Sequence, residues 1–284
     1  MIEVKILADS IGPNGVRITT FQWTYPRMVH SEVMTHRMLS RNASSSRAIP
    51  VKKQIQMVID NPAIPLAFTK NKAGMQGGDP LDGEALQRAY TAWMDARDAA
   101  VCHAQMLADL EVHKQYANRI LEPWAHITVV VTATDWDNFF ALRCHEMAQP
   151  EIHALADASY AAREASVPKV LEEGQWHLPF ITDEERQSVA LQEFFSEKDI
   201  LIKRSVARCA RVSYLNHEGK QPTLEEDLKL YERLVGSAPI HASPAEHQAQ
   251  ATNDPQFTFS GNLRGWIQYR KTLANENVLK FSKE

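Results

Sequence analysis

The sequence predicts a helix-rich, mixed α+β protein, and three features indicate this class. Residues 1–10 and 16–23 alternate apolar and polar side chains and carry β-branched residues, which is typical of strands. Residues 126–134, His-Ile-Thr-Val-Val-Val-Thr-Ala-Thr, form the strongest strand pattern in the chain. Most of the remainder has helical periodicity, without an internal repeat or a low-complexity linker. We therefore expect a single domain over residues 1–284.

Turn and cap signals delimit the individual elements. The turn Gly12-Pro13-Asn14-Gly15 joins the first two strands, and a glycine-containing loop covers residues 70–83. Three capping boxes, beginning at Thr182, Thr223 and Ser243, are each expected to start a helix. Other helices are predicted over residues 26–39, 51–60, 84–111, 114–121, 135–147, 151–165, 198–214 and 262–273.

Composition excludes several functional classes. The 284 residues are 44% hydrophobic and 23% charged, which is ordinary for a globular protein with a sizeable core. A net charge of −4 gives no support for binding nucleic acid or a membrane surface through bulk charge. No apolar run approaches the roughly 20 residues that span a bilayer, and the start lacks a signal-peptide pattern.

The three cysteines, Cys102, Cys144 and Cys209, are widely spaced and odd in number. This pattern favours reduced thiols in a cytoplasmic protein and argues against a metal framework. We expect all three to be buried small hydrophobes.

The segment from Thr35 to Arg47 is the most informative stretch of the chain. Its thirteen residues include three arginines, one histidine, four serines and one asparagine, and no carboxylate. Guanidinium groups, hydroxyls and backbone N–H groups in this density are typical of a site that binds phosphate. A solvated serine-rich loop beside a basic surface is the alternative that composition alone would favour.

Three further segments carry chemistry. Asn138 to Ile152 places Asn138, Arg143 and His145 on or near a helix, and Ala117 to Pro123 contains Arg119. His241-Ala242-Ser243-Pro244-Ala245-Glu246-His247 combines a histidine with a predicted helix start, which is a good anion site.

Together these segments resemble the signatures of the flavin-dependent thymidylate synthases, also called thymidylate synthase complementing proteins. His-Arg-x-x-Ser-x-Asn-x-x-Ser-x-Arg is met from His36 to Arg47, and Asn-x-x-x-Leu-Arg from Asn138 to Arg143. Two positions depart from the first signature, where Thr35 replaces an arginine and Glu32 replaces a glutamine, and Met147 and Thr132 replace a histidine and an asparagine that are common around the second. The His241 element follows the first signature by about 200 residues, whereas it usually precedes it, so we interpret the chain as a permuted member.

The resemblance implies a helix-rich α+β fold around an antiparallel sheet and a role for each matching residue. The implied catalytic residue is Arg143, which contacts the pyrimidine and favours ionisation of its N3. The residues implied for the nucleotide are Glu32, Ser45, Ser46, Arg47, Arg119 and Arg143. The residues implied for FAD are Thr35, His36, Arg37, Asn138, His241, Ser243 and Glu246.

The resemblance further implies the reaction. A one-carbon unit passes from methylenetetrahydrofolate, by way of the flavin, to C5 of dUMP, and FAD reduced by NADPH supplies the hydride, which gives dTMP. Members resemble one another in being homotetramers with active sites built from several subunits. No metal, nucleic acid or membrane is implied.

Three alternatives remain at this stage. The departures at Thr35 and Glu32 are compatible with a flavin-dependent methylase or hydroxymethylase of UMP, dUMP or dCMP. A non-catalytic nucleotide-binding homologue would keep the phosphate loop without flavin chemistry. A metal-dependent hydrolase using His145, Glu146 and His153 is the most distant alternative, because Gln149 stands where a zinc-protease helix needs its second histidine.

The cations Arg204, Arg208 and Arg211 repeat at helical spacing. We interpret this basic face as structural, paired with acids such as Glu225 and Glu226, rather than as a phosphate site.

Overall fold

A five-stranded sheet organises the computed structural model, which describes residues 1–187, 197–212 and 220–278. The strand order is β3-β4-β2-β1-β5, antiparallel throughout except for the parallel pairing of β1 with β5. The strands are β1 (Glu3–Ile11), β2 (Arg17–Pro26), β3 (Ser40–Ala43), β4 (His126–Ala133) and β5 (Lys169–Val170). The predicted helix-rich α+β class with an antiparallel sheet is therefore confirmed.

The first two strands form the predicted hairpin. Gly15 has a positive φ of 77° in the turn, a conformation that glycine adopts without strain. Phe21, Trp23 and Tyr25 alternate along β2 and are fully buried, because one face of the sheet is covered. That face packs against Trp136 and Phe139 in the largest hydrophobic cluster of the described residues.

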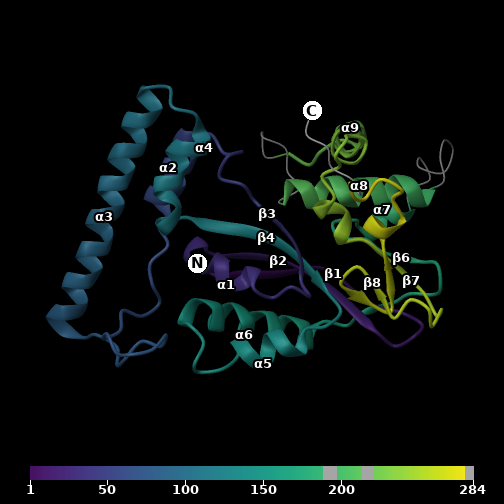
Figure 1. Cartoon of the computed structure of the whole chain (residues 1–284), viewed down its shortest axis with the longest axis horizontal. Helices are drawn as coiled ribbons and strands as arrows, with labels where there is room; N and C mark the ends of the chain where they lie inside the picture. The colour runs from purple at the N-terminus through teal and green to yellow at the C-terminus, as the bar shows by residue number, and fades with distance from the viewer. Residues whose placement is uncertain (188–196, 213–219, 279–284) are drawn as a thin grey trace.

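Helices surround the sheet in three groups (Figure 1). The helices α5 and α6 lie along one face, α2 to α4 stand at one end, and α7 to α9 lie near the other end. Their bounds are α1 (His30–Met34), α2 (Val51–Asp60), α3 (Gly83–Asp109), α4 (Lys114–Ala117), α5 (Asp137–Arg143), α6 (Pro150–Ala165), α7 (Asp183–Gln187), α8 (Glu197–Arg211) and α9 (Leu224–Val235). The 3-10 helices are η1 (Arg27–Val29), η2 (Asn118–Trp124), η4 (Ser243–Glu246) and η5 (Tyr269–Thr272).

Two small sheets complete the described fold. A three-stranded sheet has the order β10-β7-β6, and β8 pairs with β9. Their strands are β6 (Trp176–His177), β7 (Ala249–Ala251), β8 (Phe259–Ser260), β9 (Leu263–Arg264) and β10 (Trp266–Gln268). No helix among the described residues is long and apolar enough to cross a membrane.

The prediction of one helix over residues 26–39 is wrong. The α-helix ends at Met34, where Thr35 Oγ1 donates to the carbonyl of Glu32 at 2.6 Å. The Arg41 guanidinium donates to the carbonyls of Met34 at 3.0 Å and His36 at 2.7 Å, so these C-terminal carbonyls are satisfied without a further turn.

The predicted helix over residues 262–273 is also wrong. Gly261 and Gly265 have positive φ values of 62° and 66°, which turn the chain between short strands. Trp266 is fully buried in β10, opposite Ala251 of β7. Pairing with β7 therefore overrides the local helical pattern.

Two smaller expectations also fail. Ser243 does not cap a helix, because it lies inside the 3-10 helix η4 and its hydroxyl bonds to Asn42 instead. Cys102 is exposed on α3 and Cys144 is half-buried, so Cys209 alone of the three cysteines is buried as expected. The capping boxes at Thr182 and Thr223 are both formed. Tyr214, at the predicted end of the helix over residues 198–214, lies outside the described residues.

A buried polar chain crosses the sheet into the C-terminal part. Ser10 Oγ contacts His177 Nδ1 at 2.9 Å, and His177 Nε2 contacts Thr20 Oγ1 at 2.8 Å. The chain continues from Thr20 to Thr132 at 2.7 Å and from Thr132 to His247 Nδ1 at 2.8 Å. All five side chains are 5% exposed or less, so both rings lie away from water.

The two buried histidines of this hydrogen-bonded network predict that the protein loses stability sharply in acid. Burial lowers the pKa of His177 and of His247 to about 3 in the folded protein, against 6.5 ordinarily. As the pH falls from about 6.5 to about 3, the unfolded chain therefore takes up protons that the folded chain does not. We expect the free energy of unfolding to fall by about 1 kcal/mol per pH unit for each histidine.

Denaturant melts between pH 4 and 7 measure this slope. His247→Gln is expected to flatten it, whereas His103→Gln, at an exposed site on α3, leaves it unchanged. An unaltered slope in His247→Gln would show that other groups cause the acid sensitivity.

Candidate functional site

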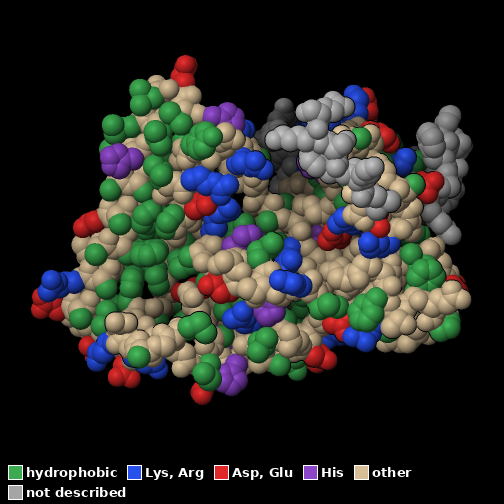
Figure 2. Space-filling model, in the orientation of Figure 1, with side chains coloured by type: hydrophobic (Ala, Val, Ile, Leu, Met, Phe, Trp, Pro, Cys, Tyr) green, Lys and Arg blue, Asp and Glu red, His purple; other side chains and the backbone are tan. Residues whose placement is uncertain are grey.

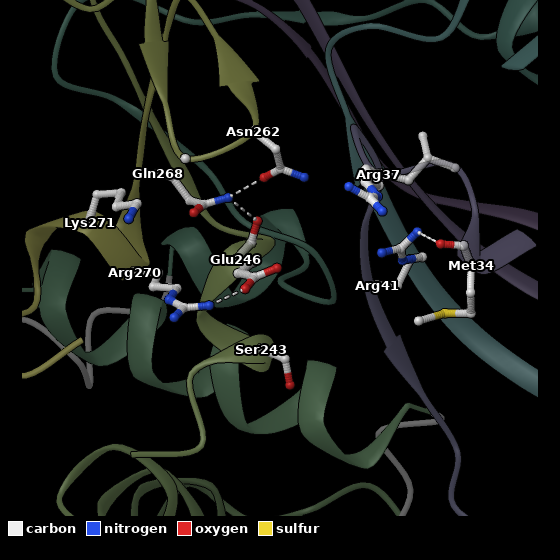
Figure 3. Close-up of a pocket in the computed structure, with 11 residues that line it drawn as sticks. Met34, Arg37, Arg41, Ser243, Glu246, Asn262, Gln268, Arg270 and Lys271 are labelled. Carbon is white, nitrogen blue, oxygen red and sulfur yellow. Dashed lines mark hydrogen bonds and ion pairs between the residues drawn. The ribbon is translucent and has the colours of Figure 1, made fainter. Parts of the chain in front are cut away.

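A pocket of about 440 Å³ lies between the segment after α1 and the C-terminal part of the chain (Figure 3). Arg37, Arg41 and Met34 form one side, and Asn262, Gln268 and Lys271 face them from the other. The full lining is Met34, Arg37, Leu39, Arg41, Ser243, Glu246, Gly261, Asn262, Gln268, Arg270 and Lys271. Four cations and one carboxylate make this a cationic pocket.

The two sides of the pocket are joined by a partly buried network of amide and hydroxyl side chains. Ser40 Oγ donates to Asn262 Oδ1 at 2.9 Å, and Gln268 Nε2 donates to the same oxygen at 2.9 Å. The amide of Asn262 donates in turn to the carbonyl of Met38. Residues more than 220 positions apart are thereby held in one fixed arrangement.

Asn42 makes a second connection. Its amide nitrogen donates to the carbonyl of Cys209 at 2.7 Å, and its oxygen accepts from Ser243 Oγ at 3.1 Å. The first signature is therefore tied both to α8 and to η4. On the side of the pocket opposite Arg37 and Arg41, Arg270 Nη1 donates to Glu246 Oε1 at 2.6 Å (Figure 3). This bond fixes the one carboxylate of the lining.

His36 and Arg143 bring the two main signatures into contact. Arg143 Nε donates to His36 Nε2 at 2.9 Å, although the residues are 107 positions apart. The His36 ring also meets Phe139 edge to face, with ring centroids 5.0 Å apart. Burial, assisted by the charges of Arg143 and Arg41, lowers the pKa of His36 to about 4. The ring is therefore neutral at pH 7 and accepts a hydrogen bond at Nε2.

A separate cluster forms around Glu122 of η2. Its Oε1 accepts from Ser46 Oγ at 2.8 Å and from Arg119 Nη1 at 2.9 Å. Arg27 Nη2 lies 3.1 Å from the same oxygen. The side-chain amide of Asn118 donates to the carbonyls of Ser46 and Ile49. These bonds fix the serine loop, residues 44–50 between β3 and α2.

The sequence-predicted residues thus fall into groups. The pocket lining includes Arg37, Ser243 and Glu246, while His36 and Arg143 lie beside it. Ser46 and Arg119 meet at Glu122; Ser46 is buried, whereas its neighbours Ser45 and Arg47 in the same loop are exposed. Strand β3 separates the two groups, and its four residues alone span about 10 Å.

Other predicted residues lie apart from these contacts. Thr35 caps α1, and the carboxylate of Glu32 accepts from Ser31 Oγ. Asn138 and His241 are exposed, and neither belongs to the lining of the pocket.

Motif reasoning missed five charged or amide side chains of the lining: Arg41, Asn262, Gln268, Arg270 and Lys271. Arg41 stood within the first signature as a cation without an assigned role. The run Asn262 to Lys271 carried a usable signal, because it combines two adjacent cations with amide side chains.

No group of three or more His, Cys, Asp or Glu side chains that could hold a metal ion occurs within residues 1–187, 197–212 and 220–278. His153 pairs with Asp157 at 3.1 Å on the same helix.

The fold and the pocket define an α+β protein with a cationic pocket that is assembled from distant segments. The model of the family "Thymidylate synthase complementing protein" matches residues 17–169. Because this match covers more than half of the chain, the protein belongs to the thymidylate synthase complementing protein family. The pocket residues from Ser243 to Lys271 lie outside the matched region.

Solved structures with partial similarity include two proteins. One is the UMP/dUMP methylase PolB from Streptomyces cacaoi bound with 5-Br dUMP, with 17% identity, a TM-score of 0.47 and coverage of 57% of this chain and 89% of PolB. The other is the flavin-dependent thymidylate synthase ThyX from Helicobacter pylori complexed with FAD and dUMP. It has 17% identity and a TM-score of 0.36, and the match covers 51% of this chain and 67% of ThyX. No curated protein sequence matches the chain at a significant level.

Proposed function

We propose that this protein is a flavin-dependent thymidylate synthase that converts dUMP to dTMP. The observation that carries the proposal is the contact of Arg143 with His36, which unites the two family signatures beside a cationic pocket. Methylenetetrahydrofolate is the proposed one-carbon donor and NADPH the proposed reductant. We assign the catalytic unit to residues 1–284.

The pocket fits the diphosphate part of FAD. Arg37 is exposed at the pocket wall, and Arg41 and Lys271 add positive charge. Ser243, Asn262 and Gln268 supply neutral hydrogen-bonding groups to the same space. A cationic, amide-lined pocket suits a diphosphate because guanidinium groups bind phosphate oxygens through paired N–H donors. Bound FAD, once reduced, supplies the hydride of the reaction.

Arg143 has the electrostatic role in the proposed mechanism. Its guanidinium carries a positive charge, so it stabilises negative charge that develops on a pyrimidine ring. Its Nε is occupied by His36, which orients the guanidinium and leaves the Nη groups for substrate. A neutral His36 accepts this bond without repelling the arginine.

Ser45, Ser46, Arg47 and Arg119 are the proposed nucleotide-phosphate residues. Because β3 separates them from Arg143, we propose that a homotetramer brings the serine loop of one subunit to Arg143 of another. Gel filtration with light scattering tests this assembly, and an active monomer would refute it.

A second candidate is a C5 methylase or hydroxymethylase of UMP, dUMP or dCMP. Thr35 favours it, because its hydroxyl caps α1 and offers no guanidinium where relatives carry arginine. Product analysis with the three nucleotides separates these activities. A non-catalytic nucleotide-binding homologue would bind the nucleotides and leave them unchanged.

Flavin binding gives a direct prediction. After addition of FAD and removal of the free cofactor, the protein is expected to show oxidised-flavin absorption bands. Arg37→Ala should weaken FAD binding about tenfold, because a charge-assisted hydrogen bond to phosphate is lost. The matched control is Arg264→Ala, which removes an exposed arginine that pairs with Asp135 outside the pocket. A flat spectrum in the unaltered protein would favour the non-catalytic alternative.

A further inference from the structure

Glu122 accepts three donors on a single carboxylate oxygen. Ser46 Oγ, Arg119 Nη1 and Arg27 Nη2 lie 2.8, 2.9 and 3.1 Å from its Oε1. The donors come from the loop after β3, from η2 and from the start of η1. Three donors from separate elements that converge on one anionic oxygen form the arrangement that commonly binds an oxygen of a phosphate group.

The surroundings of this point are cationic. Arg27 and Arg119 together outweigh the single charge of Glu122, and Lys114 donates to the carbonyl of Ala48 nearby in the same loop. Figure 2 shows Lys and Arg side chains gathered near α4 and the adjoining end of β4, with few acidic side chains among them. A phosphate dianion is therefore attracted to this surface even while Glu122 occupies the centre.

Glu122 is also able to leave the cluster. Its side chain is 23% exposed, and the Arg119 side chain is 53% exposed, so rotation of the carboxylate into water requires no opening of the core. Arg27 is better fixed, because its side chain is 18% exposed and its backbone N–H donates to the carbonyl of Ala125 at 2.9 Å. The three donor side chains therefore remain close together when another anionic oxygen takes the place of Glu122 Oε1.

We propose that Glu122 is an internal competitor for the nucleotide phosphate and that Arg27 is a further residue of the phosphate site. This inference rests on the proposed function, which places the phosphate at Ser46 and Arg119. A phosphate oxygen replaces Glu122 Oε1 among Ser46, Arg119 and Arg27, while the displaced carboxylate turns toward solvent. A dianion with several acceptor oxygens displaces Glu122, whereas a neutral nucleoside does not, so the exchange selects phosphorylated substrates.

The test measures binding of dUMP, deoxyuridine and inorganic phosphate to the full-length protein by calorimetry. Glu122→Gln keeps the shape of the side chain but removes its charge, and we expect dUMP and phosphate to bind about tenfold more tightly. Arg27→Gln is expected to weaken both by about tenfold. Binding of deoxyuridine should change in neither variant.

Asp9 supplies the matched control. Its carboxylate likewise accepts from an arginine and a hydroxyl, Arg17 and Thr19, but it lies on β1 away from the serine loop. Asp9→Asn should lower the thermal midpoint without changing phosphate affinity. Glu122→Asp, which keeps the charge on a shorter side chain, guards against a folding defect in Glu122→Gln and should bind phosphate between the other two proteins.

Weaker or unchanged phosphate binding in a folded Glu122→Gln protein would overturn the inference, because Glu122 would then organise the site or be irrelevant to it. Absence of phosphate binding in all the proteins would overturn it as well. Failure of the proposed function has a different signature. In that case dUMP is not converted, while inorganic phosphate still binds more tightly to Glu122→Gln than to the unaltered protein.

Discussion

Replacing Arg143 by alanine is expected to lower turnover of dUMP by about a hundredfold to a thousandfold while FAD stays bound. The expected loss is large because the guanidinium stabilises charge on the reacting ring, a contribution of about 3–4 kcal/mol for one well-placed donor. FAD binding survives because the pocket residues Arg37, Arg41 and Ser243 are untouched. Steady-state kinetics together with the flavin absorption spectrum measure the two effects separately.

Two comparisons sharpen this experiment. Arg143→Lys keeps the charge but loses the planar guanidinium, whose Nε donates to His36 and whose Nη groups are proposed to contact substrate. It should therefore recover only part of the activity. Arg264→Ala removes an exposed arginine elsewhere and should retain full turnover. Normal turnover in Arg143→Ala would contradict the role assigned to this residue.

Replacing Asp227 by asparagine is expected to destabilise the protein by about 3–5 kcal/mol. Asp227 is fully buried and forms ion pairs with Arg204, Arg208 and Arg211 of α8. Arg208 is itself only 2% exposed and pairs with Glu185 as well. Without the charge of Asp227, the three guanidinium groups lose a carboxylate partner that they share. Their positive charges are then poorly compensated where little water reaches them, which destabilises the folded state.

The same substitution should also weaken FAD binding. The carbonyl of Cys209 on α8 accepts from Asn42, and Asn42 accepts from Ser243 of the pocket wall. Denaturant unfolding and flavin titration measure the two effects. The control is Lys229→Ala, which breaks an exposed pair with Glu225 on the same helix and should cost less than 1 kcal/mol. Equal stability of Asp227→Asn and the unaltered protein would refute the role of this network.

The sequence predicted best the elements that local pattern determines. The hairpin and the strand after His126 were predicted because alternation and a glycine turn suffice to specify them. The helix over residues 51–60 was predicted with its bounds. The basic face of α8 was rightly interpreted as structural. Its carboxylate partners include Asp227 and Glu185, because the helix register turns Asp227 inward, and Arg211 also donates to the backbone carbonyl of Glu226.

The failures arose where distant segments decide the structure. The helix after Pro26 ends early because Arg41, on the next strand, binds its carbonyls. The segment around Trp266 becomes extended because β7 pairs with it. The periodicity of a local segment carries no information about either contact. For the same reason the C-terminal side of the pocket was not predicted.

The site was predicted only as far as the signatures reached. Arg37, Ser243 and Glu246 were named from the resemblance, and the structure places all three on one pocket. Arg270 and Lys271 were overlooked as site residues because no motif marks them and their partners lie far away in sequence. The roles of all these residues remain predictions for the experiments above.

The central claim is a flavin-dependent one-carbon transfer to the pyrimidine of dUMP. Its most direct test is mass-spectrometric analysis of dUMP incubated with the purified protein, FAD, NADPH and methylenetetrahydrofolate. We expect dTMP to form, and to form only when FAD and the folate donor are both present. Unchanged dUMP, together with unchanged UMP and dCMP, in a sample whose spectrum shows bound flavin, would contradict the proposed function.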